Sequence, residues 1–196
     1  MDNNEIKPLN TTYVYVRAWP FDVDNENVYP EDRFLEINNC TNEKVKGQKF
    51  YAWKLLEQAI EEVYGIKLED IGVVKEGQKW NADKCQISIS HSGNMVAIAL
   101  SEQPVGVDIE EENIDRFEKL RARIVHKDEV LDGVNLCVLW TMKEAVFKRY
   151  NRGVFNPRKI NTNIENVVGK VLEINNKKYA ISVSVENLEN VEYIIL

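Results

Sequence analysis

The stretch from Pro104 to Glu112, PVGVDIEEE, constrains the fold most, because it has the pattern of a β-strand with two different faces. Strand side chains alternate in direction, so the valines and the isoleucine share one face. Asp108 and Glu110 share the opposite face and lie close together. One face must therefore pack on a core, while the other holds a pair of carboxylates.

Two ionised carboxylates that lie close together repel each other. The repulsion is offset by a shared proton, a basic partner or a hard cation. A solvated strand end with two surface acids would produce the same pattern. The stretch by itself leaves both interpretations open.

A second stretch, WTMKEAVFK from Trp140 to Lys148, has helical spacing. Trp140, Glu144 and Lys148 stand at i, i+4 and i+8, so they lie along one face of the predicted helix. A buried tryptophan beside an exposed ion pair of little energetic value is the plainer interpretation. Combined with Asp108 and Glu110, however, this face supplies a third carboxylate and a cation. Three carboxylates and a cation are the groups expected in a site that binds magnesium and phosphate.

Three segments in the same order resemble the motifs of the Sfp-type 4'-phosphopantetheinyl transferases: ISISHSGNMVAIAL (87–100), PVGVDIE (104–110) and WTMKEAVFK (140–148). The resemblance covers about residues 85–153 and is weak over about the first 70 residues and the C-terminal tail. GxDxE alone is a common pattern. SHS before it and WxxKExxxK after it make the combination specific.

The resemblance implies an α+β fold of two similar subdomains related by a pseudo-twofold axis. We expect the subdomains at residues 1–102 and 103–196, packed as one unit, in a protein that is a monomer. The implied activity is that of a holo-carrier-protein synthase. Such an enzyme transfers 4'-phosphopantetheine from coenzyme A to a serine of an apo acyl or peptidyl carrier protein and releases adenosine 3',5'-bisphosphate.

The resemblance also implies a metal site and a catalytic pair. Asp108, Glu110 and Glu144 would hold Mg²⁺, with Mn²⁺ as an alternative. Lys148 would neutralise charge on phosphate oxygens. Glu144 is one candidate for the base that takes the serine proton, and a metal-bound water is the other. Lys143 points away from the acidic stripe and is expected to have a supporting role.

Four residues are candidate coenzyme A ligands by the same resemblance: Lys49, Lys79, Ser90 and His91, in addition to Lys148. His91 lies in a predicted hairpin turn (91–94), where a histidine facing solvent is the plain alternative. Lys49 belongs to a lysine-rich helix start that could simply be solvated. The family commonly has Gly-Lys-Pro where this chain has GQKW, and Asn or Asp where Ser88 stands. Glu129 matches a common family acid and is left out of the metal site.

Composition excludes several classes. The chain has 196 residues and a net charge of −7, which argues against general nucleic-acid binding. Cys40, Cys85 and Cys137 are widely spaced, so we expect no disulfide framework or zinc site and a reducing compartment, the cytoplasm. The N-terminal residues do not resemble a signal peptide, and no apolar run is long enough to span a membrane.

Residue periodicity predicts the main elements. We expect strands at 12–19, 71–74, 85–90, 96–100 and 192–196, and a hairpin formed by 167–174 and 179–185. We expect helices at 43–64, 114–123 and 140–150, the first ended by Gly65.

The predicted helix 114–123 carries the main local positive charge. Arg116, Lys119, Arg121 and Arg123 lie on it, with Lys127 just beyond. Carrier proteins are typically acidic, so this helix is a candidate docking surface, although an ordinary solvated face has the same composition. Two other functions fit the acidic residues less fully. One is a magnesium-dependent nucleotide pyrophosphate hydrolase, and the other is a non-catalytic paralogue that binds carrier proteins.

Overall fold

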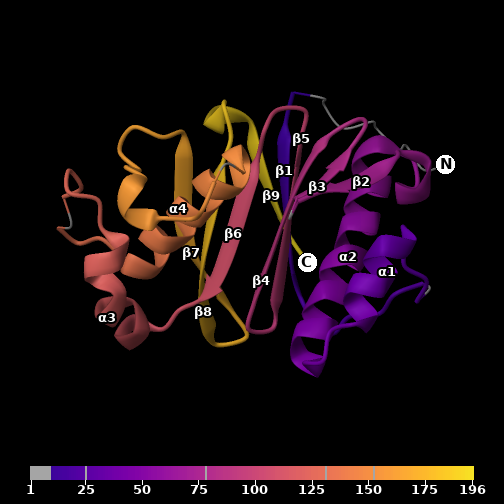
Figure 1. Ribbon diagram of the computed structural model, residues 1–196, viewed down its shortest axis with the longest axis horizontal. Helices are drawn as coiled ribbons and strands as arrows, with labels where there is room; N and C mark the ends of the chain where they lie inside the picture. Colours follow the sequence, from indigo (N-terminus) through magenta and orange to yellow (C-terminus); the bar gives the residue numbers. More distant parts are fainter. Residues whose placement is uncertain (1–9, 25, 78, 131, 152) are drawn as a thin grey trace.

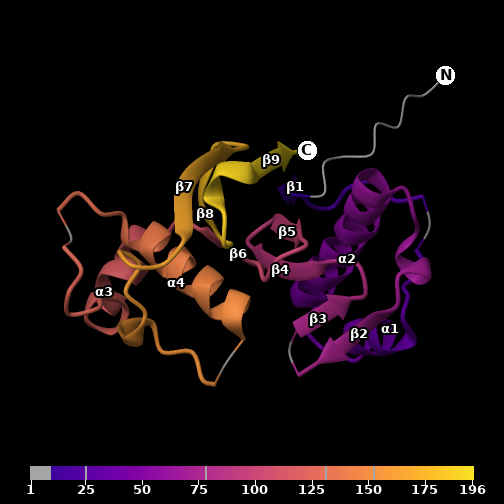
Figure 2. The same cartoon turned by 90° about the horizontal axis from the view of Figure 1, so that it is seen from above.

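The computed structural model describes residues 10–24, 26–77, 79–130, 132–151 and 153–196. Two halves, each with helices packed on a sheet, lie side by side and meet along their strands (Figure 1). Seen from above, α4 of the second half faces β3 and β4 of the first half (Figure 2). The predicted α+β class is therefore confirmed.

The first half is a sheet covered by one long helix. Its elements are β1 (Thr12–Ala18), α1 (Glu31–Asn38), α2 (Glu43–Tyr64), β2 (Val73–Glu76), β3 (Lys79–Ala82), β4 (Gln86–Ser92) and β5 (Met95–Ser101). Asn42 caps α2 by accepting the backbone N–H of Val45, and Gly65 ends it in the left-handed region at φ 65°. The buried face of α2, with Trp53, Leu56 and Ile60, packs on the sheet to form the first core.

The second half contains a smaller sheet and two helices. Its elements are β6 (Gly106–Glu111), α3 (Ile114–Ile124), α4 (Leu136–Tyr150), β7 (Val167–Ile174), β8 (Lys177–Ser184) and β9 (Val191–Ile195). Strands β6, β8 and β7 form an antiparallel sheet in that order. Single turns of 3-10 helix lie at Leu68–Asp70, Pro157–Lys159 and Leu188–Asn190.

The last strand crosses from the second half to the first. β9 pairs in parallel with β1, which gives the larger sheet the order β2-β3-β4-β5-β1-β9. The expected division at 102/103 separates the other helices and strands, but β9 lies in the first sheet. Among the described residues, one sheet has six strands and the other has three, so the pseudo-twofold relation of the halves stays a prediction.

Most predicted elements are confirmed, including the 43–64 helix and the hairpin after residue 166. Other details differ. β3 was not predicted, because its four residues KWNA are too few for their alternation to stand out. His91 was expected in a turn, but β4 continues through Ser92, and only Gly93 and Asn94 connect it to β5. This part of the prediction was wrong, because the glycine alone supplies the positive φ that the turn needs, 57° at Gly93.

A ladder of serines joins the two halves. Strand β6 is an edge strand, and its free N–H groups need acceptors. The hydroxyls of Ser88, Ser90 and Ser92 on β4 accept the N–H groups of Val107, Ile109 and Glu111, at 2.9, 3.3 and 3.0 Å. The motif ISISHS therefore sets the register of one half against the other.

Gly106 allows α4 to lie directly on β6. A Cβ at this position would lie 1.9 Å from the carbonyl oxygen of Ala145 and 2.6 Å from the backbone nitrogen of Arg149. Any side chain would therefore push the helix away. The glycine of GxDxE thus controls how close α4 comes to the acidic face of β6.

In the part of the chain that the structure describes, no helix combines the length and the apolar character that crossing a membrane requires.

Candidate functional site

Three segments meet at Asp108. The ammonium group of Lys148 on α4 donates to Asp108 Oδ1 at 2.7 Å and to Ser90 Oγ at 3.0 Å. The Ser90 hydroxyl donates to the same carboxylate oxygen at 2.7 Å. Asp108 is only 5% exposed, and a buried carboxylate needs such partners to remain ionised. The contact brings one side chain from each of β4, β6 and α4 together.

Glu110 lies beside Asp108 on the same face of β6. The Ser92 hydroxyl donates to its Oε2 at 2.7 Å, and Arg116 Nη1 lies 3.7 Å from the same atom. Burial raises the pKa of Glu110, and the charge of Asp108 raises it further, while Ser92 and Arg116 act in the opposite direction. The pair anticipated from strand alternation is therefore present, and the charge of Asp108 disfavours ionisation of Glu110.

Glu144 is the third acid of this neighbourhood. Burial raises the pKa of Glu144 to about 7, and the negative charges of Asp108 and Glu110 contribute, with Lys148 opposing them. The structure thus brings together the acids of β6 and the acid of α4, from segments that are distant in the sequence. At neutral pH the Glu144 carboxyl can both hold and release a proton.

The chemistry of these side chains fits a hard divalent cation, because every donor is a carboxylate oxygen and the acids outnumber the lysine. Lys148, however, takes one oxygen of Asp108. Among the described residues, no group of three acid, histidine or cysteine side chains is arranged to hold a metal ion. The metal site at Asp108, Glu110 and Glu144 therefore stays a prediction.

A cavity of about 180 Å³ lies between the two halves. One wall comes from β3 and β4, and the other comes from α4. Its lining combines apolar and polar side chains: Lys79, Trp80, Ile87, Ser88, Ile89, Glu144, Phe147, Lys148 and Asn151. Burial lowers the pKa of Lys79. Three of the candidate residues, Lys79, Glu144 and Lys148, thus line one cleft.

His91 lies on β4 within a positively charged region. Burial lowers the pKa of His91 to about 4, together with the charges of Lys148, Arg33 and Lys49. The imidazole is therefore neutral at physiological pH and can donate one hydrogen bond. The roles of His91 and Lys49 as coenzyme A ligands stay predictions.

Arg33 is a site residue that the sequence did not reveal. It is 4% exposed, donates from Nη2 to the Lys49 carbonyl oxygen at 2.9 Å, and lies over the Trp53 ring. Its Nε is buried with no hydrogen-bond partner among the described residues. In the sequence Arg33 ends an acidic, turn-rich stretch, and nothing there indicates burial.

A carboxylate neutralises part of this positive charge. Glu36 lies 3.1 Å from Lys49 Nζ, 2.9 Å from Lys75 Nζ and 3.2 Å from Arg33 Nη1. Burial by itself would raise the pKa of Glu36, but these three cations lower it to about 2. We refer to Glu36, Arg33, Lys49 and Lys75 as the Glu36 cluster.

The comparison with protein families bears on the part of the chain that contains the three acids. Residues 104–195 match the model of the 4'-phosphopantetheinyl transferase superfamily. This part of the chain belongs to that superfamily. No curated protein matches the chain. The suspected family is therefore confirmed, and a transferase activity is indicated.

The transferase domain defined by this match contains Asp108, Glu110, Glu144 and Lys148. The first-half candidates Lys49, Lys79, Ser90 and His91 lie outside the matched residues, as does Arg33. The roles proposed for them depend on the position of Lys79 in the cleft, on the contact of Ser90 with Asp108 and on the charges near His91.

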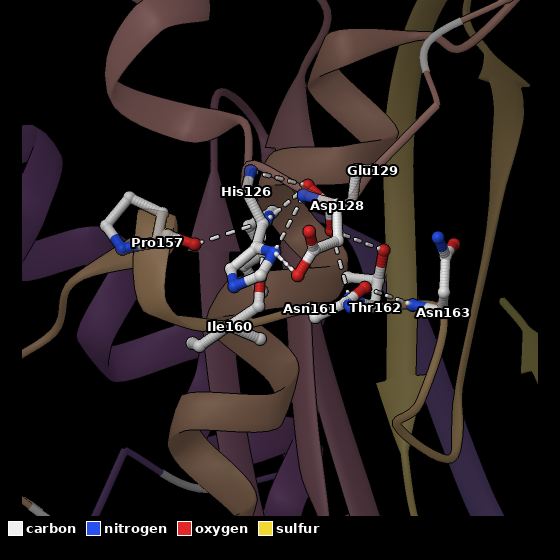
Figure 3. Close-up of polar contacts among 9 residues, drawn as sticks. His126, Asp128, Glu129, Pro157, Ile160, Asn161, Thr162 and Asn163 are labelled. Carbon is white, nitrogen blue, oxygen red and sulfur yellow. Dashed lines mark hydrogen bonds and ion pairs between the residues drawn. The ribbon is translucent and has the colours of Figure 1, made fainter.

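A buried ion pair stabilises the transferase domain on another face of α4. Lys143 Nζ lies 2.7 Å from Glu129 Oε2 and also donates to the carbonyl oxygens of Pro157 and Ile160, at 3.1 and 2.6 Å. Glu129 also accepts the backbone N–H groups of His126 and Thr162 (Figure 3). Lys143 and Glu129 therefore join the segments that precede and follow α4.

The positive charge of α3 is partly neutralised within the transferase domain. Arg121 donates to both carboxylate oxygens of Glu118, at 2.9 and 2.8 Å, and Arg116 lies near Glu110. A second basic surface lies beside α4, in a groove lined by His126, Lys127, Asn156, Arg158 and Lys159. This groove was not predicted, because its residues come from two separate segments.

Proposed function

We propose that this chain transfers 4'-phosphopantetheine from coenzyme A to a serine of an apo acyl or peptidyl carrier protein. Adenosine 3',5'-bisphosphate is the second product. The observation that carries the proposal is the contact of Lys148 with Asp108 and Ser90, beside a cleft that Glu144 also lines. Superfamily membership supports phosphopantetheine transfer in general.

Coenzyme A carries two separate anionic groups, a pyrophosphate and a 3'-phosphate. The cationic groups also fall into two sets. Lys148 and Lys79 line the cleft and suit the pyrophosphate. Arg33 and Lys49 lie near His91 and suit the 3'-phosphate, with the neutral imidazole as a hydrogen-bond donor. We therefore place coenzyme A across the seam between the halves, with all its ligands from one chain.

The reaction forms a bond between the serine Oγ of the carrier and the β-phosphorus of coenzyme A. The bond from that phosphorus to the oxygen of the leaving adenosine 3',5'-bisphosphate breaks. The serine proton goes to a carboxylate oxygen of Glu144, which lines the cleft. The Lys148 ammonium offsets the charge that develops on the phosphoryl oxygens.

Members of the superfamily generally use a divalent metal. Asp108, Glu110 and Glu144 would hold Mg²⁺ or Mn²⁺, which supplies positive charge next to the pyrophosphate. Because Lys148 donates to Asp108 Oδ1, metal binding by Asp108 requires that Lys148 share that oxygen or move away from it. An incoming phosphate gives the lysine an alternative anionic partner.

The basic groove beside α4 supports an acidic carrier protein as the partner. Lys127, Arg158 and Lys159 gather there on a chain whose net charge is −7. Complementary charge would raise the rate of encounter with an acidic carrier. The three cysteines are free, which is compatible with a reaction in the reducing cytoplasm.

Intact mass spectrometry of an apo carrier protein tests the proposal. Incubation with this chain, coenzyme A and Mg²⁺ should add the mass of one phosphopantetheine arm, and a chelator should prevent the addition. Consumption of coenzyme A without any carrier would instead identify a pyrophosphate hydrolase. Binding of the carrier without either reaction would identify a non-catalytic paralogue.

A further inference from the structure

The Glu36 cluster places one carboxylate among three cations from different elements. Glu36 and Arg33 come from α1, Lys49 from α2 and Lys75 from β2. The side chains of Glu36 and Lys49 are 25% and 26% exposed, so the cluster remains open to a solute. Its formal charge is positive even with Glu36 ionised, because three cations face one anion.

The cluster is connected to the proposed coenzyme site by two observations. Gln48, next to Lys49, donates from Nε2 to the carbonyl oxygen of Gly93 at 3.0 Å, which ties the start of α2 to the end of β4 near His91. The charges of Arg33 and Lys49 also reach His91, where they oppose protonation of the imidazole. The cations that Glu36 holds are therefore the cations assigned above to the 3'-phosphate.

We propose that Glu36 competes with the 3'-phosphate of coenzyme A for these cations and so limits the preference for coenzyme A over 3'-dephospho-coenzyme A. This inference rests on the proposed function. A phosphate that enters the cluster is repelled by the carboxylate and must share Lys49 and Arg33 with it. The dephospho form has no charge at this position and is insensitive to Glu36.

The partial exposure of Glu36 makes the competition adjustable. An ion pair that is partly open to water has a modest energy, so a phosphate dianion can take its cations. The cluster thus favours the phosphate but does so less strongly than three unopposed cations would.

Binding of the two nucleotides to the full chain and to Glu36→Gln tests the proposal. Calorimetry should show that the variant binds coenzyme A more tightly, by about three- to tenfold, because a negative charge next to the phosphate is removed. Binding of 3'-dephospho-coenzyme A should change by less than about twofold. The gain should shrink at high salt, because screening weakens charge interactions between partly exposed groups.

Asp32→Asn is the matched control. Asp32 is exposed on the same helix, and its removal changes the net charge by the same amount. In Asp32→Asn, the ratio of the affinity for coenzyme A to the affinity for 3'-dephospho-coenzyme A should equal that of the wild type. A gain for coenzyme A in both variants would show a general charge effect and would overturn the proposal.

Weaker coenzyme A binding by Glu36→Gln would also overturn it, because Glu36 would then orient the cations. An unchanged ratio of affinities would do the same. None of these results bears on transfer by the wild-type chain, which the mass assay measures separately. Failure of the wild-type chain to bind either nucleotide, together with failure of that assay, would instead remove the proposed function and this inference with it.

Discussion

Two lysines of α4 each form an ion pair of 2.7 Å, and the two pairs differ in what surrounds them. Lys143 and Glu129 are 0% and 3% exposed, and both have further hydrogen bonds to neighbouring groups. Lys148 is 27% exposed, lines a cleft and has two more acids near its partner Asp108. The comparison teaches that a closed pair stabilises a fold, while an open pair with excess charge can accept a ligand.

The largest effect is expected on stability, at the closed pair of Lys143 and Glu129. Lys143→Met would leave Glu129 buried without its cation and should lower the free energy of unfolding by about 3–5 kcal/mol. Thermal and denaturant unfolding would measure the loss.

The double variant Lys143→Met, Glu129→Leu should recover only part of this stability. The unpaired buried charge is removed, but the backbone groups that Lys143 and Glu129 bind still lose their partners. A small loss in the single variant would mean that the pair does not join the two segments around α4.

Changes at the open pair, Lys148 and Asp108, should affect transfer to the carrier. Asp108→Ala should reduce transfer to the carrier by at least about 10²-fold, with carrier binding retained, because one of the three carboxylates that would hold the divalent cation is lost. Transfer kinetics and a pull-down with the carrier measure the two properties.

Lys148→Met should lower transfer by a similar factor, about 10²- to 10³-fold, because its charge faces the same phosphate. Full activity in Asp108→Ala would place the metal elsewhere and contradict the proposed site.

The close contact between α4 and β6 at Gly106 should affect both stability and transfer. Gly106→Ala would bring a methyl group against the backbone of α4, and we expect a destabilisation of about 1–3 kcal/mol from the forced shift. Transfer should fall as Glu144 and Lys148 move away from Asp108. Unfolding curves and kinetics of the same preparation would show both effects, and wild-type kinetics would mean that the close contact has no catalytic consequence.

The smallest effect concerns His91 at the edge of the open pair. Its pKa of about 4 lies below the usual 6.5, so the imidazole loses a proton only when the pH rises through the acid range. Stability from the neutral form is present above pH 6.5 and is lost as the pH falls toward 4, because the unfolded chain binds the proton first.

A bound phosphate should favour the charged imidazole and raise the pKa of His91 by about one unit or more. NMR titration of the histidine signals with and without coenzyme A tests this, with His126 as the internal reference. An unchanged titration of His91 would mean that no phosphate lies beside it.

Sequence reasoning succeeded where the signal is local. The faces of the β6 strand, the span of α2 and the stripe of Glu144 and Lys148 all follow from periodicity. It failed for β3, which has only four residues, and for the position of His91, where the turn needs fewer residues than expected. Arg33 and Glu36 were missed because each lies in an acidic segment, and only their contacts with other elements make them candidates for the site.

What the sequence by itself determined is which side chains share a face and which family the acidic motifs resemble, since both depend on spacing along one segment. Only the tertiary structure decided that Lys148 reaches Asp108, that β9 joins the first sheet and that Glu36 lies among three cations. These contacts join segments far apart in the chain, and their geometry depends on how the helices and sheets pack against each other.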